Sequence, residues 1–83
     1  MDRALLQQEV EANYAAFQRV LRQIIGTHRN EYALMRDEAI IGYFSKPGDA
    51  YRAGVERFPD ERFSIQEVTD EPIDLGFFSH VAY

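Results

Sequence analysis

The sequence has no cysteine and only two histidines, His28 and His80. The lack of cysteine excludes disulfides and thiolate metal sites. Neither histidine has a carboxylate at a ligand-like spacing, and the acidic residues do not follow the pattern of a calcium loop, so we expect no metal and no other cofactor. A chain of 83 residues buries only about 60–65% of its unfolded surface. Without disulfides or metals, self-association is the remaining aid to stability, and we expect a homodimer.

Long apolar runs are also missing. No stretch of the chain approaches the length of about 18 apolar residues that a transmembrane helix needs. The first residues do not combine a basic start with an apolar block, so we expect no secretory signal. These two absences predict a cytoplasmic protein.

The sequence has no pattern that is typical of a catalytic site. Its five glycines, at positions 26, 42, 48, 54 and 76, are scattered, so no glycine-rich phosphate loop is present. No serine lies in the context of a nucleophile elbow. We therefore predict that the protein is not an enzyme. An enzyme that uses His28 or His80 together with a carboxylate is kept as an alternative.

Charge is distributed unevenly along the chain, which has a net charge of −5. Residues 1–36 hold five arginines and four acids, whereas residues 37–83 hold four basic residues and ten acids. The acidic half would repel a phosphate backbone and favours a solvated surface or a basic partner. Nucleic-acid binding is kept only as an alternative, through a basic stripe at the end of the first helix and on the first strand, formed by Arg19, Arg22, Arg29 and Arg36.

Helical spacing of apolar residues predicts one long helix over about residues 3–25, with Gly26 as its left-handed C-cap. A helix of this length spans about 34 Å, whereas strands of five to seven residues span only about 17–23 Å. The first half of the helix carries Leu5, Leu6 and Val10 with little of the chain left to cover them. We therefore expect Leu6 and Val10 to meet a second copy or another partner. A shorter helix with a frayed start is the alternative.

The rest of the chain predicts three strands, at about 31–36, 39–44 and 62–68, and a second helix at about 46–57. Glu38 stands in the hairpin turn where glycine is usual, which adds strain or lengthens the turn. Gly42 indicates a bulge or a close approach by another element. Ser45 is a candidate N-cap, and the stripe of Ala50, Ala53 and Gly54 indicates a helix that lies close against the sheet.

This order of elements, α-β-β-α-β, predicts a single α+β domain over residues 1–83. We expect a three-stranded, mainly antiparallel sheet in the order 2-1-3, packed on one face by helices. An apolar tail follows in residues 69–83. Adjacent residues point to opposite faces of a strand, so Phe77 and Phe78 cannot both face inward. The tail therefore either closes the protein's own core or is offered to a partner.

Residues 31–72 resemble a family of small uncharacterised bacterial proteins. That family has a strand, an Asp-Gly turn, a strand with the pattern hydrophobic-Gly-Phe-Phe, a helix with the pattern Asp-Ala-x-Arg-Ala-Gly-x-Glu-Arg-Phe, and a strand ending near Gln-x-Val. The matching segments here are Ile41–Phe44, Asp49–Phe58 and Phe63–Val68. Glu38 departs from the turn glycine, and Ser45 replaces the commoner aspartate cap. The resemblance implies this fold and implies no activity and no catalytic residue.

These observations predict a non-enzymatic protein-interaction module, of which an acidic inhibitor or antitoxin-like protein is a specific form. The partner would be bound through the tail and the first helix, since aromatic residues are enriched where partners bind. The predicted contact residues are Leu6, Val10, Leu75, Phe77, Phe78 and Tyr83. A purely structural homodimer, whose tail closes its own sheet, is the alternative. A small enzyme or a nucleic-acid binder has less support from the sequence.

Overall fold

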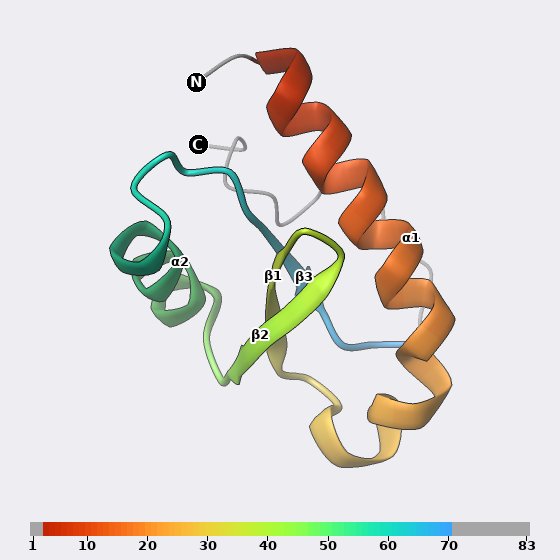
Figure 1. Ribbon diagram of the computed structural model, residues 1–83. Helices are drawn as coiled ribbons and strands as arrows, with labels where there is room; N and C mark the ends of the chain where they lie inside the picture. Colours follow the sequence, from red (N-terminus) through yellow and green to blue (C-terminus); the bar gives the residue numbers. More distant parts are fainter. Residues whose placement is uncertain (1–2, 71–83) are drawn as a thin grey trace.

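The computed structural model describes residues 3–70 of the chain. Its elements follow the predicted order, and the sheet has the predicted strand order β2-β1-β3 with both neighbouring pairs antiparallel. The α+β class is therefore confirmed (Figure 1). The elements are α1 (Arg3–His28), β1 (Tyr32–Arg36), β2 (Ala39–Phe44), α2 (Pro47–Arg57) and β3 (Ser64–Glu67).

The two helices cover opposite faces of the sheet, so the prediction that they share one face is wrong. Ala33 and Met35 of β1 belong to the buried cluster that contains Phe17 of α1. Leu34, which lies between them, belongs to a second cluster with Ala50 of α2. Three consecutive residues of β1 are buried because the central strand is apolar on both faces. Figure 1 shows the sheet between α1 and α2.

α1 continues one turn beyond its predicted end and includes Gly26, which is therefore not the C-cap. The left-handed residue after the helix is Asn30, with a φ of 71°; asparagine tolerates this conformation better than most residues. The extra turn places the His28 ring parallel to Tyr43, with 3.5 Å between ring centroids. His28 also pairs with Glu31 over 2.7 Å between Nδ1 and Oε1. Contacts with Tyr43 on β2 and with Glu31, the residue before β1, thus accompany the extension of the helix past its glycine.

α2 begins at Pro47 with Lys46 as its N-cap, so the predicted cap Ser45 lies one residue too early. Lys46 has an extended backbone, and its carbonyl accepts a hydrogen bond from the N–H of Ala50. The small-residue stripe has the predicted role. A Cβ atom on Gly54 would lie 2.6 Å from the ring of Phe63, so only glycine lets the helix approach this closely.

The β1–β2 pairing contains a bulge at the position that Gly42 indicates. Leu34 pairs with Gly42 and Met35 pairs with Ile40, which leaves Ile41 as the extra residue. Ile40 packs against the cluster on the α1 face, and Ile41 packs against the cluster on the α2 face. The bulge thus gives this short strand two consecutive apolar side chains, one for each core.

Neither of the helices within residues 3–70 combines the length and the apolar character that crossing a membrane requires.

Candidate functional site

The β1–β2 turn is a two-residue hairpin turn in a left-handed conformation. Asp37 has a φ of 53° and Glu38 a φ of 65°, and the flanking residues Arg36 and Ala39 are paired. Turns of this kind favour Asn-Gly or Asp-Gly, because the second residue needs a positive φ. A residue with a Cβ atom is disfavoured there by about 1–2 kcal/mol. The turn is therefore strained, as the sequence predicts, and it is not lengthened.

Side chains from α1 bind the two amides of this turn. The Glu9 carboxylate accepts a hydrogen bond from the N–H of Asp37 at 2.6 Å, and the Asn13 side-chain carbonyl accepts one from the N–H of Glu38 at 2.7 Å. Glu9 and Asn13 are one helical turn apart and share a face of α1, and both are buried. These hydrogen bonds offset the cost of the left-handed backbone and fix the turn against the helix.

Asn13 also connects α1 to strands β1 and β3. Its amide nitrogen lies 2.9 Å from Ser64 Oγ on β3 and 3.3 Å from the carbonyl oxygen of Met35 on β1. The same nitrogen lies 3.1 Å from Glu9 Oε2. A fully buried polar side chain is tolerated only when its hydrogen bonds are made. Asn13 meets this condition with partners on α1, β1, β3 and the turn.

Arg62, just before β3, supplies the positive charge that the buried Glu9 carboxylate requires. Its Nη1 atom lies 2.5 Å from Glu9 Oε1 and 3.0 Å from Asp37 Oδ1. The hydrogen bond to Asp37, together with the negative charges of Glu9 and Asp60, raises the pKa of Arg62 above its ordinary value. The backbone N–H of Arg62 binds Asp60 Oδ1, and this bond, helped by Arg36, lowers the pKa of Asp60. We call Glu9, Asn13, Arg62 and the Asp37–Glu38 turn the turn network.

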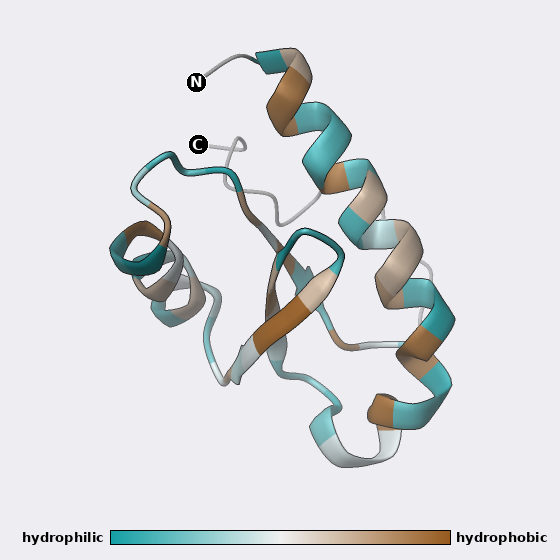
Figure 2. Ribbon diagram, in the orientation of Figure 1, coloured by the Kyte–Doolittle hydropathy of each residue, from teal (hydrophilic) through white to brown (hydrophobic). Residues whose placement is uncertain are grey.

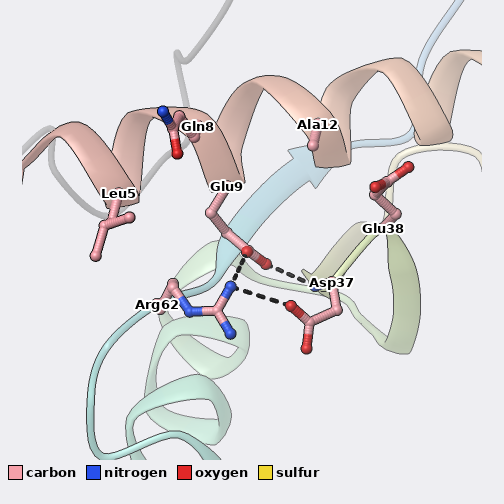
Figure 3. Close-up of a pocket in the computed structure, with 7 residues that line it drawn as sticks. All are labelled: Leu5, Gln8, Glu9, Ala12, Asp37, Glu38 and Arg62. Carbon is pink, nitrogen blue, oxygen red and sulfur yellow. Dashed lines mark hydrogen bonds and ion pairs between the residues drawn. The ribbon is translucent and has the colours of Figure 1, made fainter.

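A cavity of about 380 Å³ opens beside the turn network, between α1, the β1–β2 turn and Arg62. Figure 3 shows Glu9 pointing from α1 toward Arg62 and Asp37, with Leu5 one turn away along the same helix. Leu5 is 52% exposed, and Leu5 and Val55 are the exposed large apolar residues within residues 3–70. We call this space the α1 cavity; it is lined by Leu5, Gln8, Glu9, Ala12, Asp37, Glu38 and Arg62.

The predicted contact residues fall into two groups. Leu6 is buried, with 8% of its surface exposed, and Val10 is half-buried. The exposed leucine at the start of α1 is therefore Leu5, whereas the sequence analysis predicts Leu6 as the contact residue. The predicted tail contacts lie outside the described residues; these are Leu75, Phe77, Phe78 and Tyr83.

The turn network is not among the sites that the sequence predicts, although one signal for it is present. Glu9 and Asn13 lie between Leu6 and Phe17 at spacings of three and four residues, so two polar residues interrupt the apolar stripe of α1. A polar residue on the buried face of a helix needs a partner elsewhere in the fold. Arg62 lies 53 residues after Glu9 along the chain, and no local pattern connects the two.

Most of the other candidate groups within residues 3–70 have partners within the fold, and His80 lies outside the described residues. His28 stacks on Tyr43 and pairs with Glu31, whose charge, after the larger effect of burial, raises the pKa of Tyr43. Within residues 3–70, no three His, Cys, Asp or Glu side chains are arranged to hold a metal ion. In the predicted basic stripe, Arg19 pairs with Glu38, Arg29 with Asp70, and Arg36 with Asp60. Phosphate binding by these arginines would have to compete with carboxylates already in place.

Comparison of the chain with protein-family models, curated proteins and solved structures gives no match. The resemblance of residues 31–72 to a family of small bacterial proteins therefore stays a prediction.

Proposed function

We propose that this protein is a non-enzymatic protein-interaction module whose partner binds over the first turns of α1 and the α1 cavity. The observation that carries the proposal is the exposed Leu5 side chain at the edge of a cavity with charged walls. Interfaces typically combine an apolar centre with a polar rim. A large apolar side chain next to a hollow also gives a partner residue a pocket to fill.

The turn network supports this proposal because it holds the walls of the α1 cavity in place before any partner arrives. Glu9 and Arg62 are paired, and the turn amides are bound by α1. A preformed surface loses less conformational entropy on binding than a mobile one. The net charge of −5 adds long-range attraction toward a basic partner. An acidic inhibitor that covers the basic site of an enzyme is the specific form of this proposal.

The proposal is tested with two matched surface variants and affinity capture from the native host. Leu5→Ser removes the apolar contact beside the α1 cavity. Val55→Ser makes the same change on α2, at the other exposed large apolar residue, which is 37% exposed. We expect a partner that the wild type and Val55→Ser both retain and that Leu5→Ser loses. Equal retention by all three proteins would refute binding through this face.

A fourth protein in the same experiment, a chain that ends at Pro72, tests the predicted contacts of the tail. A partner that is lost by this shortened chain and kept by Leu5→Ser would assign recognition to the tail instead of α1.

A purely structural homodimer is the second candidate, and β2 is the feature that favours it. β2 lies at one edge of the three-stranded sheet, and residues 39–44 contain no charge. Figure 2 shows hydrophobic colour along much of β2. An uncharged edge strand is a template for pairing with a second chain, although the bulge at Ile41 opposes this. Light scattering at micromolar concentration tests the candidate: a dimer has twice the chain mass of 9.6 kDa, and a monomer removes it.

A further inference from the structure

The α1 cavity combines a negatively charged lining with an apolar wall. Among the described residues that line it, three are acidic and one is basic, so the lining has a net charge of −2. Glu9 and Arg62 are paired with each other within the turn network. The acidic side chains at the rim remain accessible to solvent: that of Asp37 is 63% exposed and that of Glu38 is 56% exposed.

The apolar wall lies on α1, across the cavity from this rim. Leu5 and Ala12 lie on either side of Glu9 along the helix (Figure 3). Lysine and arginine side chains have the same two-part character, since a chain of methylene groups carries the charged head. The volume of about 380 Å³ lies within the range of pockets that bind small ligands.

We propose that the α1 cavity binds a lysine or arginine side chain of the partner, with its methylene groups against Leu5 and Ala12 and its charged head between Asp37 and Glu38. This inference rests on the proposed function and adds to it the chemistry of the partner. Both rim carboxylates already have arginine neighbours: Asp37 lies near Arg62 and Arg36, and Glu38 lies near Arg19. Each carboxylate has further lone pairs, because a carboxylate accepts up to about four hydrogen bonds.

Charge argues against two other occupants of the cavity. A second copy of this chain would bring a net charge of −5 to a negative lining. The segment 71–83 contains Glu71 and Asp74 and no lysine or arginine, so it would also bring negative charge. Like charges placed together at an interface oppose binding. A basic segment of a different protein is the occupant that the lining favours.

The test is a titration of the isotope-labelled full chain with n-butylguanidinium chloride, followed by the chemical shifts of the backbone amides. This probe has the methylene groups and the charged head of an arginine side chain. We expect saturable shifts at Leu5, Ala12, Asp37 and Glu38, with half-saturation on the order of millimolar for so small a ligand. Sodium butyrate and n-butanol are the matched probes with negative and zero charge, and neither is expected to produce saturable shifts there.

Variants separate the two contacts that the proposal requires. Glu38→Gln and Leu5→Ala are each expected to weaken binding of n-butylguanidinium about threefold, as for the loss of one exposed contact. Glu56→Gln makes the same charge change as Glu38→Gln on the exposed side of α2 and is expected to leave binding unchanged.

Two results would overturn the inference: the absence of saturable shifts at the cavity amides, or equal binding of butyrate. Either result would leave standing a partner that depends on Leu5 in the capture experiment, so the failure of this inference differs from the failure of the proposed function.

Discussion

Replacement of Glu9 by alanine tests whether the turn network holds the fold together. The substitution removes the acceptor for the Asp37 N–H and the partner of Arg62, which lie 2.6 Å and 2.5 Å from the carboxylate. A hydrogen bond to a charged group contributes about 1.5–3 kcal/mol, and loss of one member of a buried ion pair costs about 3–5 kcal/mol. Arg62 is partly exposed and keeps Asp37, so we expect the free energy of unfolding to fall by about 3 kcal/mol.

Urea unfolding followed by circular dichroism measures this effect, and Glu11→Ala is the matched control. Glu11 lies on the exposed side of the same helix, where it accepts a hydrogen bond from Gln7. Its replacement is expected to change the free energy of unfolding by less than about 0.5 kcal/mol. With a slope near 1 kcal/mol per molar urea for a small domain, Glu9→Ala lowers the midpoint by about 3 M.

Glu9→Gln provides a second measurement if the alanine variant does not fold. Glutamine keeps an oxygen that accepts from the Asp37 N–H and loses the charge that Arg62 binds, so we expect about half of the loss. Equal midpoints for Glu9→Ala and Glu11→Ala would refute the role that we assign to the turn network.

Three further predictions concern the turn, the helix glycines and acid. Glu38→Gly is expected to stabilise the protein by about 0.5–1 kcal/mol in urea unfolding, because glycine adopts the φ of 65° without strain; a loss of stability would show that the Glu38 side chain contributes more than its backbone costs. Gly54→Ala is expected to destabilise the protein by about 1–3 kcal/mol, since the new Cβ atom would meet the Phe63 ring at 2.6 Å. Gly26→Ala is the control, because no atom lies within 4 Å of the new Cβ. It is expected to raise the melting temperature through about 1 kcal/mol of helix propensity. A Gly54→Ala variant that is more stable than Gly26→Ala would contradict the packing of α2. The hydrogen bond from the Arg62 N–H, helped by Arg36, lowers the pKa of Asp60, so the stabilising contribution of this carboxylate is complete above its ordinary pKa of 3.8 and is lost as the pH falls below it. Asp60→Asn should therefore lose less stability than the wild type between pH 6 and pH 3, and equal losses would argue against these contacts of Asp60.

The parts of the fold that depend on neighbouring residues could be predicted from the sequence. β2 was predicted with its observed bounds, because Ala39–Phe44 is a continuous apolar run after a turn. The close approach of α2 was also predicted, since Gly54 follows Ala50 by one helical turn. The strand order followed from the short hairpin and from the helix that joins β2 to β3.

The parts that depend on distant residues could not be predicted in the same way. β1 is apolar on both faces, and its residues do not say which helix covers which face. The last turn of α1 is held by His28 stacking on Tyr43, a contact that local helix rules do not contain. The turn network joins Glu9 to Arg62 across most of the chain, so its members appear in the sequence as unrelated polar residues.

The strained hairpin turn also has a consequence for the order of folding. Its amides find their acceptors on α1, 28 residues earlier in the case of Asp37 and Glu9, so the isolated hairpin lacks the contacts that offset its left-handed backbone. We therefore expect hairpin formation and helix docking to occur in one cooperative step instead of two successive ones. Folding in one step shortens the time during which the uncharged strand β2 is exposed beside other unfolded chains, which is when aggregation begins.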